Sequence, residues 1–274
     1  MMENQQQARK AATVGVFSRA AETYDRVGPR YFSYFGQRLV ELSPLVTGAK
    51  VLDLATGGGA VLFPAVDKVG PAGQVLGIDL VEEMVARTSA EIATRQLPNA
   101  SAQVMDAEQL DLGEGSFEAV LCGFGLFFFP QLAKALTEIY RVLKPGGFLA
   151  ATSWGIPDER WNWMSEVGMR PQSGGSGRPP SHATNNQWLE TGLEQAGFIN
   201  YRVIQEEKEF IFADEDEWWA TEWSHGARGC LERLEPETLE RVKSAAYQRL
   251  AQFKQPNGIP HLYRAFYSFA RKPQ

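Results

Sequence analysis

Two sets of apolar residues recur with helical spacing in the first part of the chain. They lie on either side of Gly28-Pro29 and are Val14, Phe17 and Ala21, then Tyr31, Phe35, Leu39 and Leu42. Apolar residues three or four positions apart form one face of an α-helix, and a Gly-Pro pair interrupts helices. The pattern predicts two helices over residues 11–46.

From residue 47 onward, short apolar runs alternate with longer amphipathic stretches. The runs are Lys50–Leu54, Gln74–Ile78, Ala102–Met105, Phe117–Cys122 and Phe148–Ser153, and helical patterns lie between them near 60–69, 81–95 and 131–143. Strands that alternate with helices form βαβ units, which build a parallel sheet covered by helices on both faces.

The alternation ends after residue 154. Residues 171–181 are rich in Pro, Gly and Ser and predict a loop. Residues 186–196 have a helical pattern and 201–212 predict a strand. Residues 214–254 predict two or more helices, one with Pro236 in its first turn, and 262–271 alternate as a last strand. These segments bring the expected sheet to seven strands, with a helical insertion before the last one.

Composition narrows the classes of partner. The 274 residues are 44% hydrophobic and carry a net charge of −6 without a dense Lys/Arg run. Phosphate backbones repel such a chain, so no nucleic acid partner is expected. Two cysteines do not make a disulfide scaffold. Residues 1–10 lack the apolar segment of a signal peptide, and no stretch is long and apolar enough to span a membrane, so we expect a cytoplasmic protein.

The stretch Val51–Gly59 carries the most informative motif. An apolar strand that ends in Asp53-Leu54 runs into a turn with Gly57, Gly58 and Gly59. Glycines allow a ligand to approach the backbone closely, which suggests a nucleotide-like cofactor at the carboxyl edge of the sheet. Asp79 ends the next strand, where a carboxylate can accept hydrogen bonds from ribose hydroxyls.

A dinucleotide site would show a similar order of elements. Leu62, however, occupies the position of the third glycine in the G-x-G-x-x-G pattern. Asp53 before the turn would repel a pyrophosphate and attract the ammonium group of a methionine moiety. The pattern therefore favours S-adenosylmethionine over NAD.

Together these motifs resemble the class I S-adenosylmethionine-dependent methyltransferases, and specifically small-molecule enzymes similar to the ubiquinone/menaquinone C-methyltransferases. The resemblance runs from about Phe17 to Thr152. It rests on Val51–Gly59, with Ala55 in place of the family's first glycine, and on Gly70–Asp79, Met105–Glu108, Phe117–Phe124 and Leu143–Leu149.

The resemblance implies a Rossmann-like, seven-stranded, mostly parallel sheet in an α/β protein. Residues 1–46 would form an N-terminal helical lid, 47–212 the S-adenosylmethionine-binding domain, 213–258 a helical cap inserted between the last two strands, and 259–274 the last strand.

The resemblance also assigns roles in cofactor binding. Asp53, Ala55, Gly57, Gly59 and Gly123 would surround the amino-acid end, Asp79 the ribose, and Leu80, Met84, Asp106 and Ala107 the adenine, with Tyr24 in the lid.

Several of these residues have a purely structural alternative. Asp79 is also suited to cap the following helix, Asp106 to lie in a solvated turn, and Met84 and Tyr24 to pack in the core. The seven tryptophans, all between Trp154 and Trp223, are individually consistent with core packing.

The acceptor side is less defined. Phe124 and Phe128 follow the fourth strand, where this family binds its acceptor, and depart from the FG-x-RN pattern of quinone enzymes. We expect them to line an acceptor pocket with Trp219 and Trp223, and His225 is the candidate catalytic base. No motif predicts a metal site. The expected activity is methyl transfer to O, N or C of a small, largely apolar or aromatic acceptor of secondary metabolism. The alternatives are a non-methylating reaction on the same fold or a non-catalytic module that binds S-adenosylmethionine.

Overall fold

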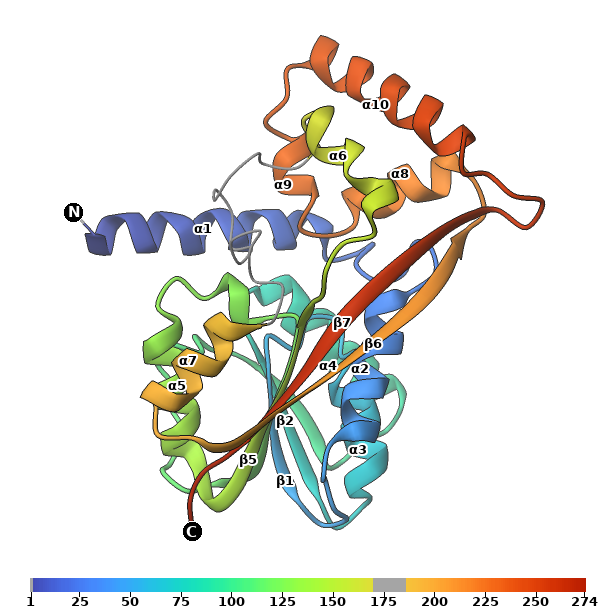
Figure 1. Ribbon diagram of the computed structural model, residues 1–274. Coiled ribbons are helices and arrows are strands. Elements are labelled where there is room, and N and C mark those ends of the chain that lie inside the picture. The colour runs from blue at the N-terminus through green and yellow to red at the C-terminus, as the bar shows by residue number, and fades with distance from the viewer. Residues whose placement is uncertain (1, 170–185) are drawn as a thin grey trace.

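A seven-stranded sheet forms the centre of the structure, a computed structural model that describes residues 2–169 and 186–274 (Figure 1). Its strands are β1 (Lys50–Leu54), β2 (Gln74–Asp79), β3 (Ala100–Val104), β4 (Phe117–Gly123), β5 (Leu143–Trp154), β6 (Ile199–Phe212) and β7 (Ile259–Arg271). The order is β3-β2-β1-β4-β5-β7-β6. Only β7 runs antiparallel to its neighbours, β5 and β6. The predicted mostly parallel sheet is confirmed.

Helices cover both faces of the sheet, as predicted. α2 (Tyr31–Leu42), α3 (Leu62–Val69) and α4 (Glu82–Thr94) lie on one face, and α5 (Leu132–Val142) and α7 (Gln187–Gln195) on the other (Figure 1). Residues of β1 alternate between the two layers, because successive side chains of a strand point to opposite faces. Val51 packs in the core beneath α2 and α3, whereas Leu52 and Leu54 pack beneath α5.

Helices α8 (Glu215–Trp223), α9 (Arg228–Leu231) and α10 (Pro236–Ala251) lie between β6 and β7 in the chain. They sit beyond the sheet, at the far end of the long ribbon formed by these two strands (Figure 1). α10 begins at Pro236, as its position predicted. We call residues 213–258 the helical insertion. None of the helices in the described part of the chain is both long and apolar enough to cross a membrane.

The connection after β5 contributes to the core of the insertion, which the sequence did not predict. It contains a short 3-10 helix, η2 (Glu159–Trp161), and α6 (Trp163–Glu166). Trp161 stacks on His261 with ring centroids 3.7 Å apart and lies 5.9 Å from Trp218. Trp161, Trp163 and Trp218 are buried, so these three tryptophans have the structural role. The predicted loop over 171–181 lies outside the described residues.

The first helix is longer than the sequence indicated. α1 spans Met2–Ala20, whereas helical periodicity begins only near residue 11. Its polar first half is tied to the main domain by Lys10, whose Nζ lies 2.6 Å from Asp106 Oδ2 and 2.5 Å from Glu108 Oε2. Ion pairs rather than an apolar face fix this part of the helix, which is why periodicity missed it.

Candidate functional site

The loop after β1 has the backbone conformation that the glycine motif indicated. Gly57 and Gly59 have φ of 51° and 84°, and Ala55, with φ of 52°, also adopts the left-handed region. This region is unfavourable for residues with a Cβ atom. The loop is therefore held in a defined and locally strained shape at the carboxyl edge of the sheet.

Asp79, at the end of β2, holds this loop in place. Its Oδ2 accepts a hydrogen bond from the Gly57 N–H at 2.9 Å, and its Oδ1 accepts one from the Val81 N–H at 3.0 Å. The second bond contacts the start of α4, in keeping with the helix-capping alternative. Each carboxylate oxygen has two lone pairs, so both retain capacity to accept a further hydrogen bond from a ligand hydroxyl.

Asp53 is the buried acid of the site. It is 1% exposed, and its Oδ2 accepts a hydrogen bond from the Thr56 hydroxyl at 2.7 Å. Its Oδ1 is buried without a hydrogen-bond partner among residues 2–169 and 186–274. Burial, reinforced by the nearby charge of Asp79, raises the pKa of Asp53 from 3.8 to about 7. A buried carboxylate in this state favours a cationic ligand.

A small cavity joins most of the residues predicted to hold the amino-acid end of the cofactor. It is lined by Tyr24, Phe32, Gly36, Asp53, Ala55, Thr56, Gly57, Ala60, Val61, Gly123 and Phe124. Its volume is about 20 Å³, enough for one or two waters. Tyr24 and Phe32 fill the space above the loop, with their rings stacked at a centroid distance of 5.0 Å. A larger ligand requires these two rings to move.

The residues predicted to surround the adenine lie beneath and beside α1. Met84 is 1% exposed and packs with Val81 against residues of α1 and the segment after it. Asp106 is bound by Lys10, and Ala107 is buried. Leu80, at the end of β2, is 37% exposed. The contact of Lys10 with Asp106 was not predicted, because Lys10 lies in a polar, Gln-rich segment.

An aromatic layer continues from the cavity toward the helical insertion. Phe124 stacks on Trp154 at a centroid distance of 4.1 Å and lies 5.7 Å from Phe32. The backbone of Phe124 is left-handed, with φ of 56°, and its N–H donates to Thr152 Oγ1 at 3.0 Å. His225 reaches the same layer, with its ring 6.2 Å from that of Phe32. Phe124 and His225 are thus brought to one side of the cavity.

The other predicted acceptor contacts lie farther from the cavity. Trp219 packs inside the insertion, 6.4 Å from the ring of Tyr247. Trp223 lies under the guanidinium of Arg228. Phe128, in the 3-10 helix η1 (Leu126–Phe128), makes an edge contact with Phe17 of α1 at 5.3 Å. In the described parts of the chain, none of these three rings makes a ring contact with a residue that lines the cavity.

Comparisons with known proteins agree with this geometry. A family model described as a methyltransferase domain matches residues 51–147. The chain is 40% identical over 149 residues to aklanonic acid methyltransferase DauC of Streptomyces sp. (strain C5). The matched region covers 54% of this chain and 68% of that protein. It is also 30% identical over 271 residues to nocamycin O-methyltransferase of Saccharothrix syringae. This match covers 93% of this chain and 97% of that protein.

The chain belongs to the S-adenosylmethionine-dependent methyltransferases. A solved structure of a candidate methyltransferase from Bacillus halodurans superimposes with a TM-score of 0.60 at 24% identity, over 86% of this chain and 98% of that one. No group of three or more His, Cys, Asp and Glu side chains in the described ranges is arranged to hold a metal ion.

The site residues of this methyltransferase fit the cofactor. The unpartnered Oδ1 of Asp53 faces a cavity beside Gly57, where the ammonium of S-adenosylmethionine would satisfy it. Asp79 keeps lone pairs for ribose hydroxyls at the end of β2. The negative charge of Asp53 would repel the pyrophosphate of NAD, so Asp53 rather than Asp79 distinguishes between the two cofactors.

Cofactor affinity is expected to rise with pH because Asp53 must ionise to bind an ammonium group. Its pKa of about 7 predicts that the affinity for S-adenosylhomocysteine falls by up to about tenfold per pH unit below 7. Because folding raises this pKa, Asp53 is protonated more readily in the folded state, and its contribution makes the free protein less stable as pH rises from about 4 to about 7. Titration calorimetry across this range checks the first effect. An Asp53→Asn variant with the same pH dependence would contradict it.

Proposed function

We propose that this methyltransferase transfers the methyl group of S-adenosylmethionine to an oxygen atom of a small, aromatic or largely apolar acceptor. The observation that carries the proposal is the aromatic layer of Phe32, Phe124 and Trp154, which begins in the wall of the cofactor cavity. Flat apolar ligands stack on such rings. The relative named nocamycin O-methyltransferase supports oxygen as the methylated atom, and the relative named for aklanonic acid supports a small organic acid as the acceptor.

The protein's residues bind and orient the reactants. S-adenosylmethionine supplies an activated methyl group, so catalysis is chiefly positioning and exclusion of water. Asp53 and Gly57 hold the amino-acid end of the cofactor, Asp79 holds the ribose, and Tyr24 with Phe32 covers the loop. Phe124 orients the acceptor from beneath. Phe128, Trp219 and Trp223 were also expected to line this pocket; we propose Phe124 and His225 as its nearest members, because their rings adjoin Phe32.

His225 fits a contact with the acceptor better than the role of a base. Its Nδ1 accepts the Ala227 N–H at 3.2 Å, so a neutral ring carries its proton on Nε2. That nitrogen lies 3.9 Å from the buried Glu222 Oε1. We therefore propose an acceptor oxygen that is acidic enough to ionise by itself, such as a carboxylic acid or an acidic phenol, since such an acceptor needs no general base.

An acceptor screen with matched variants tests this function. Aromatic carboxylic acids and acidic phenols are expected to give O-methylated products and stoichiometric S-adenosylhomocysteine, and amines are not. His225→Gln should lower kcat by less than about tenfold, whereas loss of a general base costs about 10²–10⁴-fold. Trp219→Phe, inside the insertion, should leave the acceptor KM unchanged. Two results would contradict the proposal. One is formation of S-adenosylhomocysteine without a methylated acceptor, and the other is conversion of the acceptor without formation of S-adenosylhomocysteine.

We further propose that residues 1–46 act as a lid and the helical insertion as a cap over the acceptor. Arg87 Nη1 donates to the Ala21 and Tyr24 carbonyls at 2.8 and 2.7 Å, and Arg228 Nη1 donates to the Arg19 carbonyl at 2.9 Å. These contacts support the idea that α1 joins the loop to the insertion.

The lid proposal predicts that S-adenosylhomocysteine slows amide hydrogen exchange in residues 11–30, because the cofactor adds contacts to Tyr24. Exchange in α10 is the internal control and should not change. Identical exchange in residues 11–30 with and without the cofactor product would remove the lid role.

A further inference from the structure

A second cleft lies beside the glycine loop. Its volume is about 780 Å³, within the range of roughly 300–1,000 Å³ that is typical of small-molecule sites. It is bounded by residues of α2, α3 and α4 and by Gly58 and Gly59. Among the described residues, Ala60 alone lines both this cleft and the cofactor cavity. The two openings are therefore on different sides of the loop, and Gly59, which was predicted to bind the cofactor, lines the second one.

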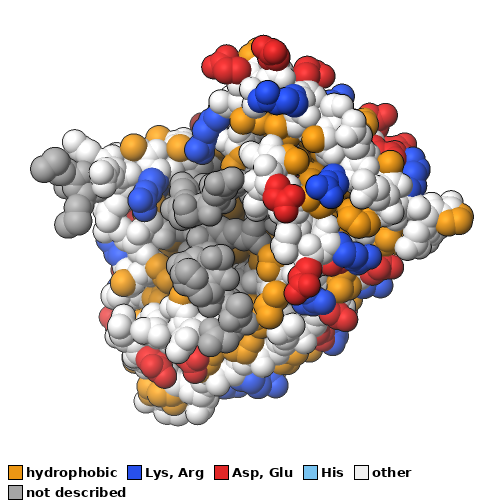
Figure 2. Space-filling model, turned by 45° about the horizontal axis from the view of Figure 1, so that its top comes forward, with side chains coloured by type: hydrophobic (Ala, Val, Ile, Leu, Met, Phe, Trp, Pro, Cys, Tyr) orange, Lys and Arg blue, Asp and Glu red, His pale blue; other side chains and the backbone are white. Residues whose placement is uncertain are grey.

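Basic side chains predominate in this cleft although the protein as a whole is acidic. Its lining includes the five cations Arg26, Arg30, Lys68, Arg87 and Arg95 against the three acids Glu41, Asp67 and Glu91. On the face shown in Figure 2, by contrast, acidic and basic side chains alternate around hydrophobic ones. The lining of the cleft is thus basic although the net charge of the protein is −6.

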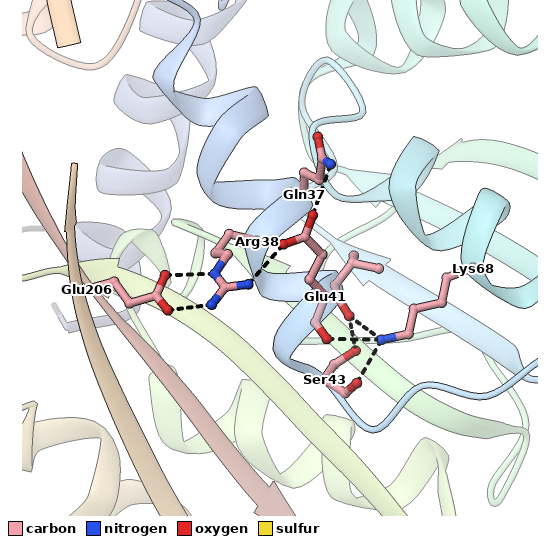
Figure 3. Close-up of polar contacts among 7 residues, drawn as sticks. Gln37, Arg38, Glu41, Ser43, Lys68 and Glu206 are labelled. Carbon is pink, nitrogen blue, oxygen red and sulfur yellow. Dashed lines mark hydrogen bonds and ion pairs between the residues drawn. The ribbon is translucent and has the colours of Figure 1, made fainter. Parts of the chain in front are cut away.

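The charges at one end of the cleft are already used within the protein. Lys68 Nζ donates to the carbonyls of Val40, Glu41 and Ser43, at the end of α2 (Figure 3). Arg38, which does not line the cleft, forms an ion pair with Glu41, with its Nη1 3.0 Å from Glu41 Oε2 (Figure 3). Arg95 is paired with Glu91 at 2.7 Å. The donors of Lys68 and the charge of Arg95 are therefore already engaged within the protein.

Three guanidinium groups at the other end have no carboxylate partner in the described residues. Within residues 2–169 and 186–274, the guanidinium groups of Arg26, Arg30 and Arg87 form no ion pair with a carboxylate, and that of Arg26 donates no hydrogen bond. Arg30 and Arg87 instead donate to backbone carbonyls of residues 21–25. Burial and the repulsion of Arg26 and Arg30 lower the pKa of Arg87, although the buried carboxylate of Asp25 opposes this shift. The three cations therefore line one cleft, in which Arg26 and Arg30 both repel Arg87.

We infer that this cleft is a binding site for a phosphate group of a small soluble ligand, distinct from the cofactor site. A phosphate carries up to two negative charges and several acceptor oxygens, which match the planar donor forks of several guanidinium groups. An anion placed between Arg26, Arg30 and Arg87 relieves their mutual repulsion. A single carboxylate would neutralise only one of the three.

Titration calorimetry with inorganic pyrophosphate at low ionic strength tests this inference, with the full chain saturated with S-adenosylhomocysteine. Binding is still expected under these conditions, because the cleft is separate from the cofactor cavity that S-adenosylhomocysteine fills. Arg26→Ala should weaken it by about threefold to tenfold, and Arg26→Glu should abolish it. Arg26 makes no contact that the fold requires, and thermal unfolding of both variants should match that of the parent protein. Arg233→Ala, an equal charge change in the insertion, should have no effect.

Three results would overturn the inference. They are no binding of pyrophosphate at millimolar concentration, binding that persists unchanged in Arg26→Glu, and binding that disappears when S-adenosylhomocysteine fills the cofactor site. A membrane source of the phosphate is tested by sedimentation with vesicles of phosphatidylcholine and phosphatidic acid. No binding to vesicles is expected, and Arg26-dependent binding to vesicles without binding to pyrophosphate would also contradict a small soluble ligand.

Discussion

Replacing Asp79 with alanine is expected to weaken the binding of S-adenosylhomocysteine by at least about a hundredfold. The variant loses two charge-assisted hydrogen bonds to the ribose, each worth about 1.5–3 kcal/mol. It also frees the N–H groups of Gly57 and Val81, which Asp79 now holds at 2.9 and 3.0 Å. The glycine loop then loses the contact that fixes its left-handed backbone. Titration calorimetry at pH 8, where Asp53 is ionised, gives the affinity directly.

Two variants make the Asp79 result interpretable. Asp79→Asn keeps one acceptor oxygen and should lie between the parent protein and Asp79→Ala. Asp111→Ala removes an exposed acid elsewhere and should bind normally. If Asp79→Ala binds S-adenosylhomocysteine as tightly as the parent, Asp79 serves only to cap α4 and does not hold the ribose.

Replacing Gly36 with alanine is expected to destabilise the protein by about 2 kcal/mol, although the same change inside a helix usually stabilises by about 1 kcal/mol. A Cβ atom at Gly36 would lie 2.3 Å from the Ala60 carbonyl oxygen and 2.6 Å from its carbon. Because these are backbone atoms of the segment leading into α3, α2 has to move away from it. Gly36 and Ala60 both line the cofactor cavity, so the affinity for S-adenosylhomocysteine should fall as well.

Gly15→Ala is the matched control, since Gly15 also lies within a helix. A Cβ atom there would meet only the mobile end of Arg19, at 3.2 Å. Thermal unfolding should show a slight gain in stability for Gly15→Ala and a clear loss for Gly36→Ala. Equal effects of the two substitutions would mean that α2 is not packed tightly on the loop.

The central sheet could be predicted because its sequence signals are local. Apolar runs such as Lys50–Leu54 mark strands buried on both faces, and the segments between them have helical periodicity. The elements that were not predicted from the sequence lack such local signals. η2 and α6 are short and owe their positions to Trp161 and Trp163, which pack on the distant Trp218 and His261. The first half of α1 depends on the ion pairs of Lys10 with Asp106 and Glu108.

The candidate site was predictable where a motif fixes the backbone and not where side chains converge from distant segments. The Gly57 turn, Asp53 and Asp79 are such motif residues. Phe32, which covers the turn, escaped prediction, although the run Tyr31-Phe32-Ser33-Tyr34-Phe35 contains more rings than one helix face needs for docking. Trp219 was grouped with His225 from sequence proximity alone. Successive helix positions face different directions, and in the structure Trp219 packs on Tyr247 whereas His225 adjoins Phe32.

A crystal structure of the protein bound to S-adenosylhomocysteine tests the central claim most directly. We expect the ribose hydroxyls within hydrogen-bond distance of the Asp79 carboxylate, the ammonium on Asp53, and the sulfur directed at Phe124. The rings of Tyr24 and Phe32 should have moved from above Gly57 to cover the cofactor. S-adenosylhomocysteine bound in the cleft of Arg26 and Arg87, or bound with its sulfur pointing away from the aromatic layer, would contradict the account.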